Sequence, residues 1–437
     1  MQKDKIKIAF ATQGCKLNFA ETSGLKADLP EDICEVVPFS AQADIYVINT
    51  CTVTDAADKK GRNLISRANR MSPDSKVIVV GCQSQVNAEK MSELEGVALV
   101  LGNQEKFELS SFIKNLYDEK IDKVIHVTER KQMDRFFSAV SQSDRTRCFL
   151  KIQDGCDYFC SYCIVPHARG KSRSASVEEV VSQIKNERKK GINEVILTGV
   201  NTGDFGKTTG ETLCHLIEQI FEHTDLPRLR LSSVEPDLLT DDIIALFGKY
   251  PRLMPYIHLP LQSGSDEVLQ KMKRRYTTSF FEGRVTRLLK EVPHAFVGVD
   301  VICGFPGETK VNAEETRAFL ASLSFSALHV FPYSSRPGTP AAESDLQVSS
   351  AEKDRRTKEL FMLSEEKKKA FYLRFADSVQ EVLVEKISLS GKGEGFTENY
   401  IPVTFEASPE VKRNTIVKVK LTQEMLNEKV KGNLYHG

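Results

Sequence analysis

The sequence predicts an α/β protein in three parts. We expect an N-terminal parallel-sheet domain over residues 1–115, a central partial (β/α)6 barrel over residues 142–372, and a small all-β module over residues 373–437. Short β-branched runs alternate with polar, helix-like stretches through most of the chain, which is typical of parallel sheets with crossover helices. Near the C-terminus the pattern changes to short strands separated by Gly, Pro and Asn. A chain of 437 residues is also too long for one ordinary core.

The N-terminal region contains three strand-like runs, at residues 6–12, 45–49 and 77–80. Each precedes a polar, helix-like stretch, so the strands are expected to be parallel. Residues 108–145 are charged and poorly patterned after Asn115, and they predict a helix followed by a linker.

The central region repeats this alternation six times. Six consecutive strand–helix units fit an open partial barrel better than a closed barrel of eight, and active sites of such folds lie at the carboxyl ends of the strands. The intervening segments are long and amphipathic, for example residues 176–190. The candidate strands are residues 148–153, 194–198, 228–233, 256–261, 295–303 and 327–333.

The C-terminal region begins with a strongly charged stretch at residues 350–375, which predicts a long helix whose charges form a solvated face. Short strands at residues 379–387, 395–405 and 414–421 then predict the small all-β module.

The composition indicates a globular protein of the cytoplasm. Hydrophobic residues make up 41% and charged residues 27%. No apolar run approaches the roughly 20 residues that cross a bilayer, and the N-terminus lacks the features of a signal peptide. In a reducing compartment the ten cysteines indicate metal ligands, catalytic thiols or small core residues. Lys plus Arg equals Asp plus Glu at 60 each, so a nucleic-acid partner would have to meet a local basic patch.

The first cysteine set is Cys156, Cys160 and Cys163, directly after a candidate strand. Three thiolates on one tight loop can bind three irons of a 4Fe-4S cluster and leave the fourth iron open. An open iron can chelate S-adenosylmethionine, and an electron from the cluster can then generate a 5′-deoxyadenosyl radical. A structural zinc site is the alternative, but zinc needs a fourth ligand, which would be His167 or a distant cysteine.

The second set is Cys15, Cys51 and Cys82, each just past the carboxyl end of a candidate strand. One such cysteine is more often a small buried residue. Three in equivalent positions can converge in the crevice beyond the strand ends, which indicates a second cluster with an open iron for an exogenous sulfur. The remaining cysteines have no partner at a useful spacing and are interpreted as structural: Cys34, Cys148, Cys214 and Cys303.

Both cysteine sets, with their surroundings, resemble the methylthiotransferase family of radical S-adenosylmethionine (radical SAM) enzymes over nearly the whole chain. The tail motif GEGFTENYIPV (393–403) is similar to the TRAM module at the C-terminus of that family. The other motifs that carry the resemblance are TQGCKLNFAET (12–22), INTCTVTDAADKKGR (48–62), VVGCQSQ (79–85), KIQDGCDYFCSYCIVPHARGKSRS (151–174), LTGVNTGDFG (197–206), RLSSVEP (230–236), HLPLQSGSD (258–266), DVICGFPGET (300–309) and YSSRPGT (333–339).

Within the family, GCKLN with NTCTVT most resembles the MtaB-type branch. This implies addition of a methylthio group to carbon 2 of N6-threonylcarbamoyladenosine at position 37 of tRNA. Lys16-Leu17 follows the first cysteine, whereas the isopentenyladenosine branch typically has Gln-Met and the ribosomal-protein branch Pro-Lys. One departure is Gly61-Arg62, where Ser-Arg is usual.

The resemblance implies two 4Fe-4S clusters and two molecules of S-adenosylmethionine, one donating a methyl group to cluster-held sulfur and the other generating the radical. Both open irons must then face one cavity. The cofactor-binding candidates are Tyr162, Thr198, Gly199, Ser232 and Glu235. A plain βα turn would also explain the glycine, and solvent exposure would also explain Ser232 and Glu235.

The candidate residues for binding the substrate are lysines and arginines. Arg169 and Arg173 follow the first cysteine loop and could hold a carboxylate or a tRNA phosphate, although such residues are usually only surface. Residues 271–276 (KMKRRY) form a second basic block. Arg336 is the candidate for the threonyl carboxylate. Of Phe396, Tyr400 and Phe405 in the tail, some must be core, which leaves few for base stacking.

The implied partners are the tRNA anticodon stem-loop, a flavodoxin-type electron donor and a sulfur source, with no membrane. One alternative is a methylthiotransferase that acts on isopentenylated tRNA or on a ribosomal protein. A second alternative, of another class, is a non-catalytic RNA-binding protein with structural clusters.

Overall fold

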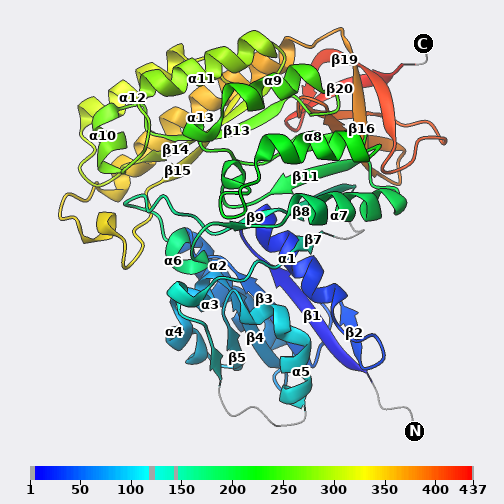
Figure 1. Ribbon diagram of the computed structural model, residues 1–437, viewed down its shortest axis with the longest axis vertical. Helices are drawn as coiled ribbons and strands as arrows, with labels where there is room; N and C mark the ends of the chain where they lie inside the picture. Colours follow the sequence, from blue (N-terminus) through cyan, green and yellow to red (C-terminus); the bar gives the residue numbers. More distant parts are fainter. Residues whose placement is uncertain (1–4, 118–123, 142–145, 436–437) are drawn as a thin grey trace.

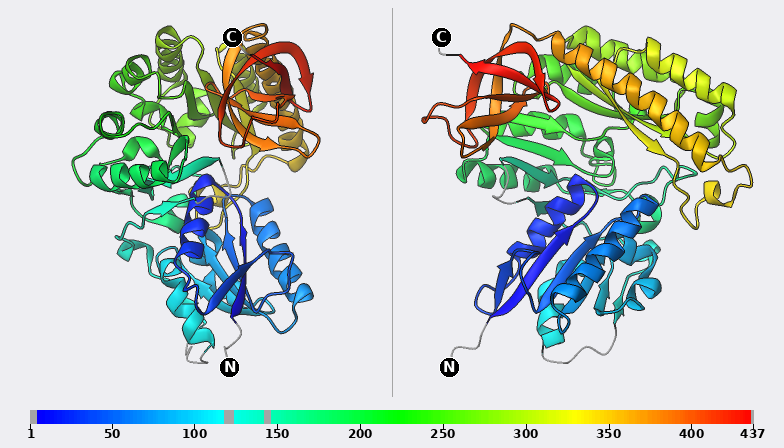
Figure 2. Two further views of the ribbon diagram at one scale, coloured as in Figure 1. Left: turned by 90° about the vertical axis from the view of Figure 1, so that its right-hand side faces the viewer. Right: turned by 180° about the vertical axis from the view of Figure 1, so that it is seen from behind.

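The structure, a computed structural model, describes residues 5–117, 124–141 and 146–435. Three parts follow one another along the chain, with the N-terminal domain at one end of the molecule and the all-β module at the other (Figures 1 and 2). The predicted boundary at residue 142 and part of the predicted linker lie outside the described residues.

The N-terminal domain is built on a six-stranded parallel sheet in the order β2-β1-β3-β4-β5-β6. All three predicted strands are present, and three shorter ones were missed. Strand β3 is buried at every position because helices cover both faces of the sheet. The strands are β1 (Ile6–Thr12), β2 (Cys34–Val37), β3 (Ile45–Thr50), β4 (Lys76–Gly81), β5 (Val97–Leu101) and β6 (Ile125–His126).

Two helix layers bury the two faces of this sheet. On one face, α1 (Lys16–Ala27) and α5 (Leu109–Tyr117) contribute Leu25 and Ile113 to the core; on the other, α2 (Asp55–Met71) and α4 (Ala88–Ser92) contribute Ile65 and Met91. The short helices α3 (Cys82–Val86) and η1 (Glu105–Glu108) follow β4 and β5. The domain is thus a doubly covered parallel sheet with its strand ends free to form a site.

The central domain contains all six predicted strands, parallel and in chain order. Pairings link β8, β11 and β12 and also β13, β14 and β15, while isolated bridges between residues 229 and 253 and between 233 and 258 connect the two groups. The strands are β8 (Arg147–Lys151), β11 (Glu194–Thr198), β12 (Arg228–Leu231), β13 (Tyr256–Gln262), β14 (Phe296–Cys303) and β15 (Ala327–Pro332). Three two-residue strands accompany them: β7 (Ala139–Val140), antiparallel to β8, and the antiparallel pair β9 (Gln153–Asp154) and β10 (Arg173–Ser174).

Helices cover the outer face of these strands (Figure 1). Ser176 caps α7 through a capping box with Glu179, as expected for a Ser followed by Glu three residues later. Helix α13 matches the predicted charged helix and packs against β15. The helices are α6 (Val165–Arg169), α7 (Val177–Lys189), α8 (Leu213–His223), α9 (Asp241–Lys249), α10 (Asp266–Lys271), α11 (Thr278–Glu291), α12 (Lys310–Ser322) and α13 (Ser350–Leu373), with single 3₁₀ turns at η2 (Arg130–Gln132), η3 (Thr202–Asp204), η4 (Pro236–Leu238) and η5 (Pro340–Glu343).

The C-terminal module is a closed five-stranded barrel in the order β16-β17-β18-β20-β19. The run predicted as one strand at residues 395–405 is two strands, because Tyr400 adopts a positive φ of 67° in the turn between them. The strands are β16 (Val379–Ile387), β17 (Lys392–Thr397), β18 (Pro402–Glu406), β19 (Ile416–Leu426) and β20 (Lys429–Leu434).

The barrel packs against the amino ends of the central strands. Its core is continuous with Tyr256 and Phe296, the first residues of β13 and β14. Tyr400 lies 4.8 Å from the Tyr256 ring, and Phe396 stacks on Tyr400. Phe405 is buried in the barrel core. Of the three tail aromatics, Phe405 is therefore core, whereas Phe396 and Tyr400 are partly buried and pack on each other.

Among the described residues, no helix is both long and apolar enough to cross a membrane.

Candidate active site

The loop of Cys156, Cys160 and Cys163 lies between β9 and α6, beyond the carboxyl end of β8. A tight turn at Gly155 starts it, with φ +71°, and a Cβ there would lie 2.0 Å from the Lys171 carbonyl oxygen. Only glycine fits this position, because both the backbone conformation and the close approach exclude a side chain. Phe159, also at positive φ, turns the chain between the first two cysteines.

The second cysteine set converges at the carboxyl edge of the N-terminal sheet, as predicted. Cys15 follows β1, Cys51 follows β3 and Cys82 follows β4. Because β1 lies between β2 and β3, the strand order reverses between β1 and β3, and α/β sheets bind ligands at such a switch point. A Cβ on Gly14 would lie 2.8 Å from the Cys51 Cβ, so the loops after β1 and β3 are in direct contact.

The residues around both sets fit bound clusters better than single zinc ions. Tetrahedral zinc at about 2.3 Å from each sulfur would place the sulfurs roughly 3.8 Å apart. Among the described residues, three ligand atoms within 4.8 Å of one another occur at His258, Asp300 and His329 and at neither cysteine set. Wider spacing is what a multi-iron cluster requires, since each cysteine then binds a different iron.

Unsatisfied polar atoms gather beside both cysteine sets, although buried polar groups are ordinarily hydrogen-bonded. Beside the second set, the buried side chains of Gln13, Gln83 and Ser84 have atoms without a hydrogen-bond partner. Beside the first set, at the carboxyl ends of β11 and β12, the same holds for Thr198 and Ser232. Both regions are therefore chemically incomplete in a way that a bound group could satisfy.

The free thiols are protonated, so that binding of a metal would release protons. Burial raises the pKa of Cys51 and of Cys156 to about 12. Both are protonated at neutral pH without metal, and a thiol must lose its proton to become a ligand.

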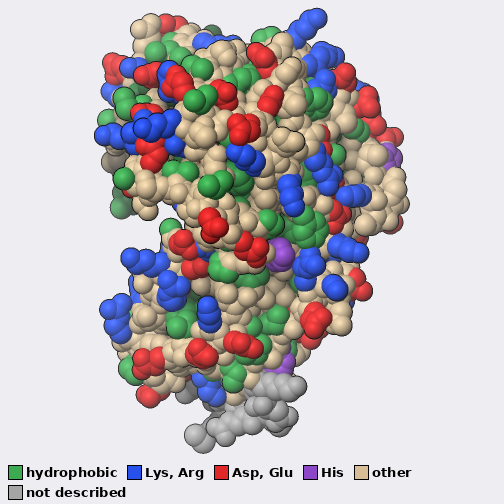
Figure 3. All heavy atoms as spheres, turned by 90° about the vertical axis from the view of Figure 1, so that its left-hand side faces the viewer, with side chains coloured by type: hydrophobic (Ala, Val, Ile, Leu, Met, Phe, Trp, Pro, Cys, Tyr) green, Lys and Arg blue, Asp and Glu red, His purple; other side chains and the backbone are tan. Residues whose placement is uncertain are grey.

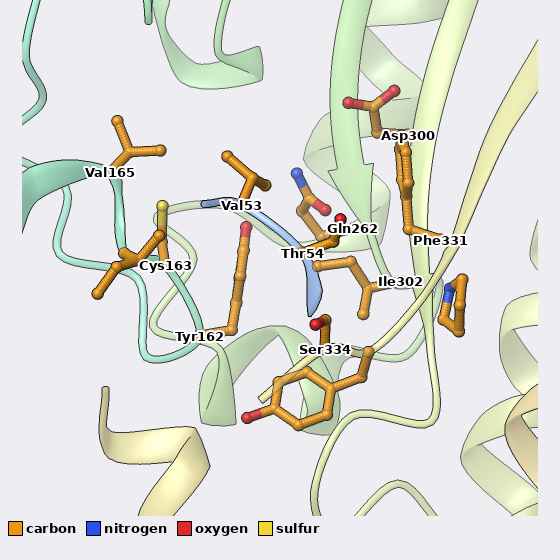
Figure 4. Close-up of a pocket in the computed structure, with 13 residues that line it drawn as sticks. Val53, Thr54, Tyr162, Cys163, Val165, Gln262, Asp300, Ile302, Phe331 and Ser334 are labelled. Carbon is orange, nitrogen blue, oxygen red and sulfur yellow. The ribbon is translucent and has the colours of Figure 1, made fainter. Parts of the chain in front are cut away.

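A cavity of about 220 Å³ adjoins the first cysteine set and the loop that follows Cys51. Cys163 and Tyr162 line it from the first set, while Val53 and Thr54, two and three residues after Cys51, line it from the N-terminal domain. Figure 4 shows Tyr162 and Cys163 on one side and Ile302 and Phe331 on the other. One cavity, partly open to solvent, is therefore lined by residues of both loops.

The five predicted cofactor residues differ in what surrounds them. Thr198 and Ser232 have the unpartnered hydroxyls described above, and Tyr162 lines the cavity. Glu235 is paired with Arg274, and burial raises the pKa of its carboxyl group. Close packing explains the glycine at position 199, because a Cβ there would lie 2.7 Å from Gln153 Oε1.

Arg274 contacts the first cysteine set, a contact that the sequence did not predict. Its Nη1 lies 3.1 Å from Cys160 Sγ, and its other nitrogens bond Glu235 and the Tyr276 hydroxyl. The assignment of this basic block to an RNA surface is therefore wrong for Arg274, whose side chain is buried. Nothing local separates it from its neighbours Lys273 and Arg275; only the folded chain does.

Arg169 and Arg173 are also not on the surface. Both are buried, and both bond Asp154. Arg169 reaches across to the N-terminal domain, where it bonds Glu21 at 3.0 Å and Asn18 at 2.6 Å. The predicted phosphate-binding role is corrected for both residues. Arg169 joins the two domains, with buried carboxylates on both sides that neutralise it, and Arg173 bonds Asp154 within the central domain.

The contact between the two domains includes more buried charges than Arg169. Glu21, on the helix that starts after Cys15, also accepts bonds from Lys106 at 2.7 Å and Lys151 at 2.8 Å, with every side chain fully buried. Burial alone would raise the pKa of Glu21, but Arg169, Lys106 and Lys151 hold it well below its usual range. Asn103 donates to the Ala168 carbonyl at 2.8 Å. The helices next to the two cysteine sets are thus fixed relative to each other.

Arg336 is likewise already paired. It is 3% exposed, and it bonds Asp55 and Asp58 on the first turn of α2. Its assignment to the substrate carboxylate is corrected, because the guanidinium already has two carboxylate partners. The residue instead ties the loop after β15 to the N-terminal domain.

A hydrogen-bonded cluster of His258, Asp300 and His329 adjoins the cavity, which Asp300 lines. His258 Nε2 lies 2.6 Å and His329 Nδ1 lies 3.0 Å from Asp300 Oδ1, and the Ser233 hydroxyl lies 2.6 Å from His258 Nδ1. Burial alone would raise the pKa of Asp300, but the two histidines lower it to about 2. Asp300 is therefore ionised over the whole physiological range.

The lowered pKa of Asp300 predicts how its contribution to the free energy of unfolding changes with pH. The pKa is lower in the folded than in the unfolded chain (about 3.9), so the contribution of about 2.5 kcal/mol is complete above about pH 5 and is lost as the pH falls through 2. We expect Asp300→Asn to lower the free energy of unfolding by about that amount at pH 7, and the difference from wild type to close near pH 2. Urea denaturation at several pH values measures it, with exposed Asp345→Asn as control. A constant difference across this range would contradict the assignment.

Comparisons with known proteins agree with this architecture. Residues 150–320 match the radical SAM superfamily, and residues 7–102 match an uncharacterized protein family, UPF0004. The fold resembles the radical S-adenosylmethionine methyltransferase TsrM from Kitasatospora setae, solved with cobalamin and a [4Fe-4S] cluster, with a TM-score of 0.57 at 15% identity over 78% of this chain and 77% of that one. The cobalamin-dependent radical enzyme OxsB gives a TM-score of 0.51 at 12% identity over 78% of this chain and 55% of that one. With its three-cysteine loop at the strand ends, the protein is a radical SAM enzyme.

Proteins with similar sequences show to which family of radical SAM enzymes the chain belongs. The chain is 37% identical to the threonylcarbamoyladenosine tRNA methylthiotransferase MtaB of Bacillus subtilis, over 95% of this chain and 93% of the relative. It is 36% identical to the same enzyme of Aquifex aeolicus, over 93% and 98%. A tRNA-2-methylthio-N(6)-dimethylallyladenosine synthase of Jannaschia sp. is 31% identical over 96% and 92%. The chain belongs to the radical SAM methylthiotransferase family.

Proposed function

We propose that this enzyme adds a methylthio group to carbon 2 of N6-threonylcarbamoyladenosine at position 37 of tRNA. The observation that carries the proposal is a cavity lined both by Cys163 and Tyr162 and by Val53 and Thr54, two and three residues after Cys51. A reaction that joins hydrogen removal to sulfur transfer needs both sites to reach one substrate atom, and holding the reacting groups together supplies much of the rate.

Each cysteine set would hold one 4Fe-4S cluster, with Cys156, Cys160 and Cys163 at one and Cys15, Cys51 and Cys82 at the other. When bound, the first cluster with S-adenosylmethionine supplies one-electron chemistry able to remove hydrogen from an unreactive carbon. The unpartnered hydroxyls of Thr198 and Ser232 are placed to bond the polar groups of that cofactor.

The chain's own residues position the substrate and exclude water. Ile302 and Phe331 form an apolar wall of the cavity, and Tyr162 lies opposite them. Gln262 adopts a positive φ of 72° at a β-bulge in β13, which turns its amide into the cavity lining. Backbone strain of this kind is retained mainly where a side chain must be aimed.

The proposal includes a domain assignment: a methylthiotransferase domain at residues 1–115, a radical SAM domain at residues 142–372, and a TRAM module at residues 373–437. The closed barrel and the motif GEGFTENYIPV support the last of these. We also propose a cytoplasmic enzyme that contacts the anticodon stem-loop and receives electrons from a flavodoxin-type protein and sulfur from a separate source.

A second candidate substrate is isopentenylated adenosine, because relatives named for the dimethylallyladenosine reaction are 29–31% identical to this chain. The relatives named MtaB reach 32–37%, and this difference favours the threonylcarbamoyl substrate.

The reconstituted enzyme is expected to methylthiolate tRNA that carries threonylcarbamoyladenosine, and to act at least about tenfold less on isopentenylated or unmodified tRNA of the same sequence. A substrate group that the site is built to bond gives discrimination of this size or more, since its loss leaves buried polar groups unpaired. Mass spectrometry of the digested nucleosides measures both products. Preference for the isopentenylated tRNA would replace this substrate with the second candidate. Production of 5′-deoxyadenosine without methylthiolation of any of the three tRNAs would place the substrate elsewhere.

A further inference from the structure

The exposed face of helix α2 is basic from its second turn to its end. Every exposed residue between positions 59 and 70 is a lysine, an arginine, Asn63 or Ser66. No acidic residue occurs in this segment, although the whole chain has no net charge. The exposed cations are Lys59, Lys60, Arg62, Arg67 and Arg70. We call these five residues the α2 basic face.

Among the described residues, none of these cations is bonded to a carboxylate, although the charge of Arg62 acts on Asp58 from a longer distance and favours its ionised form. Asp55 and Asp58 lie four residues before Lys59 and Arg62, a spacing at which helical ion pairs form. Both aspartates instead bond Arg336 from the central domain. The interdomain contact thus occupies the nearby anions and leaves the basic face with little compensation.

Another charged helix of the same protein behaves differently. On α13, Arg355 bonds Glu352 and Glu359, and Lys368 bonds Glu365. A solvated helix face is ordinarily balanced in this way by pairs three or four residues apart. The α2 basic face therefore needs a reason beyond helix stability or solubility.

The position of α2 supplies a reason. Val53 and Thr54, directly before the helix, line the cavity beside the first cysteine set. Residues 59–70 lie from about 7 to about 24 Å along the helix axis from Thr54, at 1.5 Å per residue. A broad surface hollow of about 1150 Å³ runs along the helix; Lys60, Arg62 and Arg70 line it on one side, and Glu95 contributes a carboxylate. Figure 3 shows Lys and Arg side chains gathering on the N-terminal domain next to the recess that separates it from the central domain.

We propose that the α2 basic face binds the phosphate backbone of the substrate RNA beside the nucleotide that enters the cavity. This inference rests on the proposed function and names the surface that function requires. Lysine and arginine contact phosphates, and Asn and Ser side chains add hydrogen bonds to the same oxygens. Because the enzyme must unstack one base of a loop to reach it, anchoring of the adjacent backbone is needed in the same place.

The test variant is Lys59→Ala/Arg62→Ala/Arg70→Ala in the reconstituted full-length enzyme, with Arg67 kept because it packs on the Phe39 ring. The probe is the proposed substrate tRNA, with binding measured by fluorescence anisotropy at several salt concentrations. We expect affinity at least about tenfold weaker and a slope of log K against log salt that is smaller by about two to three, as for three lost phosphate contacts.

The matched control removes three exposed cations from other helices, Lys185→Ala/Lys189→Ala/Lys290→Ala. It should bind tRNA as wild type does, so that loss of positive charge alone is excluded as the cause. An unchanged affinity and salt slope in the α2 variant would overturn the proposal.

Two further readouts separate the remaining outcomes. Formation of 5′-deoxyadenosine with dithionite should be unchanged in the α2 variant, since none of the three side chains contacts the cysteine sets. If tRNA binding is unchanged but turnover with a reduced flavodoxin falls, the face binds an acidic electron donor and the proposal is wrong. If wild type binds and modifies no tRNA, the proposed function itself fails, whatever the variant does.

Discussion

Replacement of Cys156, Cys160 and Cys163 by alanine together is expected to abolish both 5′-deoxyadenosine formation and methylthiolation while leaving about four irons per chain. The three thiols belong to one loop between β9 and α6, and the second set is held by a different sheet. Loss of one set should therefore leave the other cluster in place. Iron and sulfide analysis of anaerobically prepared protein measures the first quantity, and product analysis measures the other two.

The reciprocal variant, Cys15→Ala/Cys51→Ala/Cys82→Ala, should keep about four irons and continue to form 5′-deoxyadenosine but transfer no methylthio group. Cys214→Ala changes a half-buried thiol outside both sets and serves as the control. Loss of all iron in either triple variant would show that the two sites depend on one another. An iron content unchanged from wild type would show that the substituted cysteines are not ligands.

Glu21→Gln is expected to lower the free energy of unfolding by about 3–5 kcal/mol, a large effect for a change of one side-chain atom. Glu21 is fully buried and accepts bonds from Lys106, Lys151 and Arg169. Removing its charge leaves those buried cations with too little compensation, and an uncompensated buried charge costs far more than a lost surface pair. Chemical denaturation of the metal-free protein at pH 7 measures the change.

Glu35→Gln is the matched control, because Glu35 is exposed on β2 of the same domain. It should change stability by less than about 0.5 kcal/mol. A similarly small effect of Glu21→Gln would contradict the interpretation that this network joins the two domains. Lys106→Met tests the network from the cationic side: with Glu21 still bonded by two other cations, it should cost less than Glu21→Gln.

The sequence by itself determined the order of the parts and the positions of the two cysteine sets at the strand ends. Six central strands and three of the N-terminal ones were predicted within about two residues of their observed bounds. The reason is that alternation of apolar and polar residues follows directly from the two-residue period of a strand and the 3.6-residue period of a helix. The three-cysteine loop needed only local spacing. The scattered set needed one further rule, that the ends of parallel strands meet at one edge.

The short strands β2, β5 and β6 were missed because runs of two to five residues do not distinguish a strand from a loop. The tail run at residues 395–405 was predicted as one strand because nothing in it signals that Tyr400, a non-glycine residue, takes a positive φ.

Only the tertiary structure decided what each arginine does. Arg169, Arg173, Arg274 and Arg336 were predicted from their neighbours in sequence to face substrate, whereas the fold buries all four against carboxylates that lie up to 281 positions away, as for Arg336 and Asp55. A cation's role depends on which anion the fold brings within about 4 Å of it, and that pairing has no local signal. The same pairings withdraw Asp55 and Asp58 from α2 and leave its five cations facing solvent beside the cavity.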